Sequence, residues 1–150
     1  MALHKTASAD SAETGKGNYA TNGNDGNIST RWCANDSNTG HWWMVDLGGN
    51  ANITGTKVLW ETNGAYQYKI DVSTDNSTWT NKVDKSGNTT AAQLISDSFT
   101  ATARYVRITV TGLPSGDWAS FYEFSVFGTA GSTPVSFNDN FNDNAISNAW

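Results

Sequence analysis

A run of oxygen-bearing residues between Asn22 and Thr30 could bind a hard cation. Asp25, Asn27 and Thr30 supply carboxylate, amide and hydroxyl oxygens, and Gly26 allows a tight turn that would bring backbone carbonyls together. Calcium takes about six to eight oxygen ligands, many of them backbone carbonyls, so this loop could hold one. The spacing does not match an EF-hand. An Asx-turn without a metal is the alternative, because Asp-Gly-Asn is also ordinary turn chemistry.

Trp118 and Tyr122 could provide flat apolar surfaces for a sugar. Both lie in the segment 113–122, which we expect to be a polar loop between two strands. An aromatic ring in such a loop can pack against the C–H face of a pyranose at a low cost in side-chain entropy. The alternative is a loop that is anchored by its own aromatic side chains.

Three acidic residues near predicted loops could accept hydrogen bonds. Glu13 precedes a Gly-rich stretch, Asp36 lies in a polar segment, and Glu61 follows Trp60 at the end of a predicted strand. Carboxylates accept hydrogen bonds from sugar hydroxyls, and several that converge on one pocket favour a positively charged ligand such as an amino sugar. The alternative is a solvated rim in a protein whose formal net charge is −5.

The same residues do not form a recognisable catalytic set. Glycoside hydrolysis needs two carboxylates about 5 to 10 Å apart, one of them with a raised pKa. Glu61 and Asp36 could be close together, but the sequence indicates no enclosing cleft around either of them. His4 and His41 are the only histidines, and no Gly-x-Ser-x-Gly elbow occurs. We therefore expect a binding domain rather than an enzyme.

The composition argues against several classes of partner. The chain has 150 residues, of which nine are Lys or Arg, and these are scattered. Nucleic acids and anionic membranes are bound mainly through clustered basic residues, so we expect neither as a partner. No apolar run approaches the ~20 residues of a membrane span. Cys33 is the only cysteine, so the chain can form neither an intramolecular disulfide nor a thiol-rich metal site.

The elements that position these residues are predicted to be β-strands. Apolar and polar residues alternate over 66–73, as in a half-buried strand, and further strands are marked at 105–110 and 124–128. Clusters of Asn, Asp, Gly and Ser separate the strands, which favours an all-β antiparallel sandwich. Residues 17–38 have few aliphatic side chains, and we expect them to form a long folded loop.

The chain is predicted to extend beyond this domain. We assign residues 1–128 to the sandwich and 129–136 to a linker, because the latter are rich in Gly, Ser and Thr and include a Pro. Residues 137–150 begin a new aromatic and acidic pattern that looks like the opening strand of a concanavalin-like jelly roll. A disordered tail is the alternative for this last segment.

An ordered set of motifs resembles the discoidin domain, also called coagulation factor 5/8 type C, a family that includes the bacterial carbohydrate-binding modules of family 32 (CBM32). In chain order, the motifs are Asp25-Gly26-Asn27, Thr30-Arg31-Trp32, Trp42 to Gly48, Ser73-Thr74-Asp75 with Trp79, Arg104 to Ile108, and Glu123-Phe124. The resemblance covers roughly residues 2–128. It implies a discoidin-like jelly-roll sandwich that binds ligands with loops at one rim and performs no catalysis.

The resemblance also implies a structural calcium ion. Its ligands would be the side chains of Asp25 and Thr30, carbonyls from around Asn22 and Asn27, and Glu123 from near the last strand. The ion would join the first long loop to that strand, in place of the disulfide that usually closes animal members of the family.

Further roles for aromatic residues follow from the same resemblance. Trp32, Trp42 and Trp79 match interior aromatics of the family. Trp43 and Trp60 stay undecided, because neighbouring residues in a strand point to opposite faces.

We therefore predict a secreted bacterial module, monomeric, that keeps a catalytic domain of the same chain near a polysaccharide. Its ligands would be chain ends or short oligosaccharides, including amino sugars such as chitosan oligomers. In the discoidin arrangement the expected binding residues share one rim: Glu13, Arg31, Asp36, Glu61, Trp118 and Tyr122. Two alternatives stay open, namely neutral sugars (galactose-containing glycans or β-glucan) and cell-surface or lipid docking.

Overall fold

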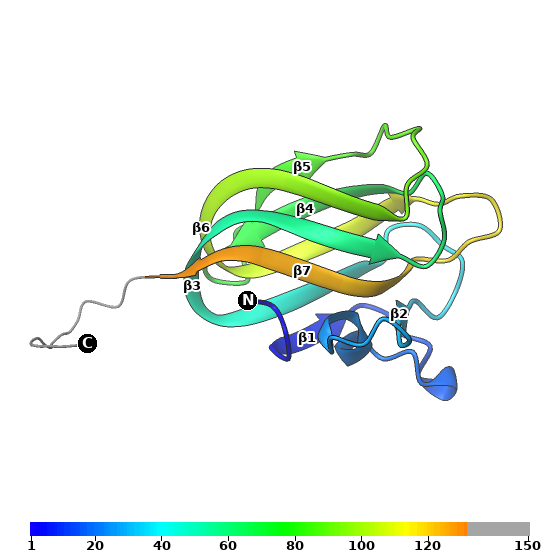
Figure 1. Cartoon of the computed structure of the whole chain (residues 1–150), viewed down its shortest axis with the longest axis horizontal. Coiled ribbons are helices and arrows are strands. Elements are labelled where there is room, and N and C mark those ends of the chain that lie inside the picture. Colours follow the sequence, from blue (N-terminus) through cyan, green and yellow to red (C-terminus); the bar gives the residue numbers. More distant parts are fainter. Residues whose placement is uncertain (132–150) are drawn as a thin grey trace, which may run out of the picture.

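Alternating apolar and polar residues produce seven β-strands in the computed structural model, which describes residues 1–131 (Figure 1). The elements are β1 (Thr6–Ala9), η1 (Thr14–Lys16), η2 (Ala20–Asn24), β2 (Trp32–Cys33), β3 (Trp42–Trp60), β4 (Gln67–Ser73), β5 (Thr80–Asp84), β6 (Leu94–Gly112) and β7 (Ser120–Ala130), where η marks a short 3₁₀ helix. Neither helix is long and apolar enough to span a membrane. The predicted tail 137–150 lies outside the described residues, as does the linker except for its start, because β7 includes residues 129 and 130.

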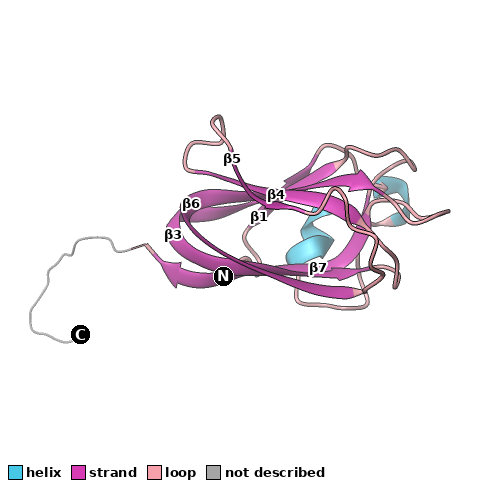
Figure 2. Ribbon diagram, turned by 90° about the horizontal axis from the view of Figure 1, so that it is seen from above, coloured by secondary structure: helices cyan, strands magenta, loops and turns pink. Residues whose placement is uncertain are grey.

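Two long strands, β3 and β6, pass through both layers of a sandwich (Figure 2). In one layer the first part of β3 pairs with β1 and with the second part of β6, which continues to β4 and β5. In the other layer the second part of β3 lies between the first part of β6 and β7, and β2 pairs with β7. The register of β3 against β6 shifts between Asp46 and Ala51, where Gly48 has a φ of 87°. All these pairings are antiparallel, which confirms the predicted all-β sandwich.

Aromatic side chains fill the space between the two layers. The largest buried side chains include Trp32, Trp43, Trp60, Tyr66, Tyr68, Phe121 and Phe124. The rings of Trp60 and Tyr66 stack with centroids 4.1 Å apart, and Trp43 meets the edge of Phe121 at 5.4 Å. Burying one large apolar side chain contributes roughly 2 to 3 kcal/mol, so this cluster is a main source of stability.

Three tryptophans were expected in the interior, and for two of them the structure shows that this prediction was wrong. Trp32 is fully buried, but Trp42 and Trp79 are only half-buried. Trp42 precedes Trp43 in β3, and because successive side chains alternate between faces, burial of Trp43 turns Trp42 outward. Trp79 lies just before β5, where the Arg107 guanidinium stacks on its ring at 4.0 Å. The undecided pair, Trp43 and Trp60, belongs to the core.

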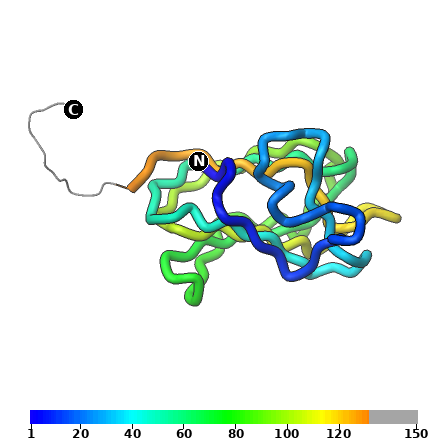
Figure 3. The backbone as a smooth tube through the Cα atoms, turned by 90° about the horizontal axis from the view of Figure 1, so that it is seen from below, coloured from blue at the N-terminus to red at the C-terminus, as the bar shows by residue number. Residues whose placement is uncertain are grey.

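The long segment 17–38 is mostly loop, but it contains η2 and the short strand β2. Gly23 of η2 packs against the core so closely that an added Cβ would lie 2.8 Å from Phe121 and 2.9 Å from Trp43. Trp43 also donates a hydrogen bond from Nε1 to the carbonyl of Ala20 at 2.8 Å. The loop is therefore fixed to the sandwich, and Figure 3 shows the N-terminal segment running along the same side of the molecule.

Candidate functional site

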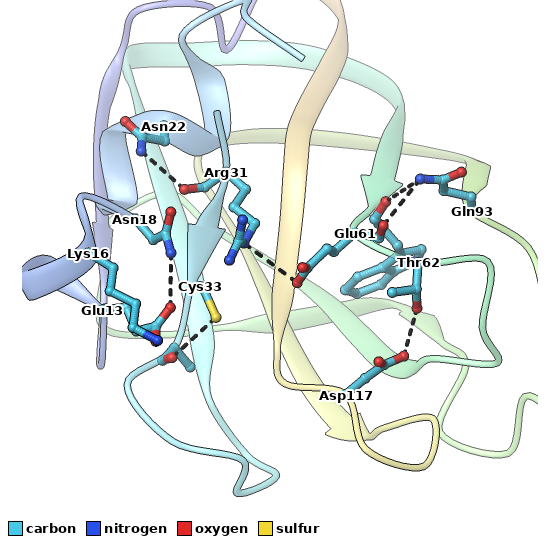
Figure 4. A network of polar contacts seen from close by, with 12 residues as sticks. Glu13, Lys16, Asn18, Asn22, Arg31, Cys33, Glu61, Thr62, Gln93 and Asp117 are labelled. Atoms are coloured by element: carbon cyan, nitrogen blue, oxygen red, sulfur yellow. Dashed lines mark hydrogen bonds and ion pairs between the residues drawn. The ribbon is translucent and has the colours of Figure 1, made fainter. Parts of the chain in front are cut away.

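A hollow of about 230 Å³ lies among the connecting loops of the sandwich, and we call it the rim pocket. It is lined by Glu13, Lys16, Arg31, Cys33, Glu61, Gly116, Asp117 and Trp118. Figure 4 shows the polar residues of this lining and their contacts. These residues come from the segment around η1, from β2 and the residue before it, and from the loops that follow β3 and β6. The structure thus brings together four of the six predicted binding residues, namely Glu13, Arg31, Glu61 and Trp118.

The Glu13 carboxylate is held in one orientation by a tight turn. Glu13 and Asn18 form an isolated antiparallel bridge around η1, and Gly17 closes that turn with a φ of 75°. Asn18 Nδ2 donates to Glu13 Oε1 at 2.9 Å, and Lys16 Nζ lies 3.5 Å from Oε2. The hydrogen bond from Asn18 is the main cause that lowers the pKa of Glu13, so this residue is an anionic acceptor near neutral pH.

Arg31 and Glu61 form a second acid–base pair in the rim pocket. Arg31 Nε lies 3.6 Å from Glu61 Oε1, and both side chains are half-buried. Arg31 Nε is buried and has no hydrogen-bond partner of good geometry. The backbone of Glu61 is fixed by its N–H, which donates to the Ser120 carbonyl, and by its own carbonyl, which accepts from Gln93. The pair is therefore not fully satisfied, because the buried Nε has no acceptor.

Sequence reasoning missed four lining residues: Lys16, Cys33, Gly116 and Asp117. Asp117 lies next to the predicted Trp118, and its Oδ2 accepts a hydrogen bond from Thr62 Oγ1 at 2.6 Å. This bond ties the β6–β7 loop to the loop that follows β3. Lys16 lies three residues after Glu13, a spacing that could have indicated the pair. Burial raises the pKa of Cys33 to about 11, so its thiol stays protonated.

Asp36 and Tyr122, the other two predicted binding residues, do not line the rim pocket. The segment 113–122 is not a loop throughout, because β7 begins at Ser120 and Tyr122 is a half-buried strand residue. Asp36 Oδ1 lies 2.6 Å from Nε2 of His41. Tyr122 thus belongs to β7 and not to the loop, and the Asp36 carboxylate contacts His41.

The oxygen-rich loop closes on the last strand. Gly26, whose φ is 76°, donates its backbone N–H to Glu123 Oε2 at 3.0 Å. Asp25 accepts hydrogen bonds from Thr30 Oγ1 at 2.5 Å and from the N–H of Asn27 at 2.9 Å. Burial, followed by the neighbouring Asp25, raises the pKa of Glu123 to about 7. The two carboxylates and the Thr30 hydroxyl therefore converge in one place.

The remaining predicted metal ligands also belong to this loop. The Asn27 carbonyl accepts from the N–H and hydroxyl of Thr30. Asn22 uses its side-chain amide to bond the carbonyls of Gly17 and Arg31, so it holds the loop closed. Within residues 1–131 no three His, Cys, Asp or Glu side chains are grouped to hold a metal. A cation here would need hydroxyl and carbonyl oxygens as well as two carboxylates, a set that suits calcium.

A larger hollow of about 430 Å³ lies where β3 crosses between the layers. Its lining runs over residues 47–51 and also includes Met1, Lys5 and the end of β7. Lys5 is the only ionisable side chain among these residues, so this hollow lacks the convergent acids and aromatic ring of the rim pocket. The smaller hollow is therefore the better candidate for sugar recognition.

Comparison with known proteins shows the family to which the chain belongs. The family model described as the F5/8 type C domain matches residues 4–124. Chitosan-binding module 1 of a chitosanase/glucanase from Paenibacillus sp. IK-5 is 34% identical, with a TM-score of 0.74, over 85% of this chain and 97% of its own. Module 2 of the same enzyme, solved with chitotriose, is 29% identical, with a TM-score of 0.76, over 85% of this chain and 98% of its own.

A third similar structure contains a different sugar. The CBM32 of AlyQ, in complex with 4,5-unsaturated mannuronic acid, is 34% identical, with a TM-score of 0.68, over 85% of this chain and 98% of its own. No curated protein sequence is significantly similar to the chain. The relationships confirm the expectation of a binding module rather than an enzyme. The chain belongs to the F5/8 type C domain family, in which it is a carbohydrate-binding module of the CBM32 type.

Proposed function

We propose that the rim pocket binds the end of a carbohydrate chain that carries amino groups. The observation that supports this proposal is the convergence of Glu13 and Glu61 beside Trp118 in one small hollow. Two fixed carboxylates can accept hydrogen bonds from an ammonium group and from hydroxyls, while the indole ring packs on the sugar face. Chitosan-binding modules are among the similar structures, at 34% and 29% identity.

An acidic sugar is a second candidate ligand, and a specific observation favours it. Lys16 and Arg31 line the same hollow, and their cations could pair with a uronate carboxylate. The similar AlyQ module was solved with an unsaturated mannuronic acid. The rim pocket therefore offers groups for either charge, and the balance between them decides the ligand.

For the calcium ion we propose a structural role. The contact between Asp25 and Glu123 is the observation that fits it, because two carboxylates this close gain from a shared cation. Calcium would be held by these two side chains with Thr30 and carbonyls from around Asn22 and Asn27. It would fix the loop that precedes Arg31 to β7 and so stabilise the approach to the rim pocket.

In the whole protein the module would act by proximity. We infer a secreted bacterial enzyme whose catalytic domain lies elsewhere in the same chain and is kept near its polysaccharide by this monomeric module. A tethered domain gains effective concentration without any new contact. The proposal requires only weak, reversible binding of a chain end, which an open hollow of about 230 Å³ suits.

The function can be tested by calorimetric titration at pH 6 with calcium present. Glucosamine oligomers would be compared with mannuronate oligomers and with neutral β-glucan and galactose-containing oligomers. Binding of the glucosamine series in preference to the others is the expected result. Binding only to neutral sugars would remove the acidic residues from recognition, and sedimentation with liposomes would expose the lipid-docking alternative.

A further inference from the structure

Glu13 already has a cationic partner inside the rim pocket. Lys16 Nζ lies 3.5 Å from Glu13 Oε2, so a sugar ammonium group that paired with Oε2 would compete with it. Asn18 occupies the other carboxylate oxygen, so Oε2 is the side of Glu13 left for a ligand. The Glu13 side chain is only 10% exposed, whereas that of Lys16 is 75% exposed. The acid is therefore fixed, and the lysine can leave at little cost.

The charge of the rim pocket depends on where Lys16 points. Three carboxylates and two cations line it, so the lining carries one net negative charge when Lys16 is in place. When Lys16 turns out to solvent, the lining carries two. Arg31 cannot make the same exchange easily, because its Nε is buried and its backbone carbonyl is bonded to Asn22. Among the charged residues that line this hollow, only Lys16 is exposed, and the others are buried or half-buried.

We infer that Lys16 is a specificity-determining residue that competes with cationic sugars for Glu13 and favours anionic ones. This inference rests on the proposed function, because it assumes that the sugar binds in the rim pocket. An amino sugar must displace Lys16 from Oε2, which weakens its binding. A uronate meets the lysine as a partner, which strengthens its binding. A neutral sugar gains or loses little from the same side chain.

The variant Lys16→Gln tests the inference by predicting opposite effects on two ligands. The exposed fraction of Lys16 limits the effect of the ion pair, so about a two- to fivefold change in affinity is expected. The variant should bind a glucosamine trimer more tightly and a mannuronate trimer more weakly than the wild type, and a neutral glucose trimer about equally. Both changes should shrink in 0.5 M salt, where the Debye length is shorter than in dilute buffer. Lys16→Arg should restore wild-type preferences.

Lys82→Gln is a matched control, because it removes the same charge from an exposed position of β5 outside the rim pocket lining. Equal effects of the two variants would overturn the inference, since the cause would then be net charge. If the wild type binds the glucosamine trimer and Lys16→Gln binds it equally well, the inference is overturned, but the proposed function stands. If neither wild type nor Lys16→Gln binds a charged trimer, the proposed function fails, and the inference fails with it.

Discussion

His41 should make the stability of this domain depend on pH through a bridge between two carboxylates. Its Nδ1 lies 2.9 Å from Asp10 Oδ2, and its Nε2 lies 2.6 Å from Asp36 Oδ1. Only the imidazolium form can donate to both partners, because neutral imidazole has a single N–H. Burial alone would lower the pKa of His41, but the hydrogen bonds to Asp36 and Asp10 outweigh it and raise the pKa above the ordinary 6.5.

The sign and size of the effect follow from these contacts. A pKa that is raised in the folded state stabilises the fold below about pH 6.5, and the contribution is lost as the pH rises through the folded-state pKa. The His41 side chain is 12% exposed, but that of Asp36 is 52% exposed, so the second contact is worth little. We expect the contact between His41 and Asp10 to contribute up to about 1 kcal/mol, or roughly 3 to 5 °C in Tm for a domain of this size.

Thermal melts at pH 5.5 and pH 8.5, with calcium fixed, would measure the effect. The Tm of His41→Gln should lie below that of the wild type at pH 5.5, and the difference should largely vanish at pH 8.5. Comparing the difference between proteins removes the contribution of Glu123, whose pKa of about 7 lies between these two pH values. The control is His4→Asn, at the other histidine. Its Tm should stay close to that of the wild type at both pH values. An equal gap between wild type and His41→Gln at both pH values would refute the bridging argument.

Three further predictions concern the rim, the metal and the core. Glu61→Gln should weaken binding of a glucosamine trimer by roughly five- to thirtyfold in calorimetry, and by less at high salt. Its affinity for a neutral trimer should be nearly unchanged. Equal losses of affinity for both trimers would point to an altered pocket shape instead. A chelator should lower the Tm by several degrees, since calcium at about 100 times its Kd contributes about 2.7 kcal/mol, and Glu123→Gln should abolish this response. Gly23→Ala should cost about 1 to 3 kcal/mol in urea unfolding by overpacking, whereas Gly15→Ala, where an added Cβ meets nothing within 4 Å, should cost far less.

The sequence predicted the fold well because local alternation and tertiary burial agree. The pattern over 66–73 becomes β4, whose inward residues are buried. The passage of β3 and β6 through both layers was not predictable in the same way. It depends on the change of register near Gly48, and a Gly-Gly-Asn segment is equally typical of a turn that ends a strand.

The candidate site was predictable only in part, because proximity across loops depends on tertiary pairing. The resemblance placed Glu13, Arg31, Glu61 and Trp118 at one rim, and the structure gathers them. Asp36 illustrates what sequence could not show, since its partner His41 lies on the far side of a polar loop. Lys16 was not predicted, although its position three residues after Glu13 is a spacing that could have indicated their ion pair.

Recognition at this rim depends on the sandwich as much as on the exposed side chains. The N–H of Glu13 donates to the Cys33 carbonyl, that of Glu61 to Ser120, and that of Ala34 to Ala119, so the segments around the rim pocket are bonded to one another. A ligand therefore meets a backbone that is already ordered, and binding incurs little loop entropy. Specificity then falls to side chains that can still move, of which Lys16 is the clearest, and a change of sugar needs no change of fold.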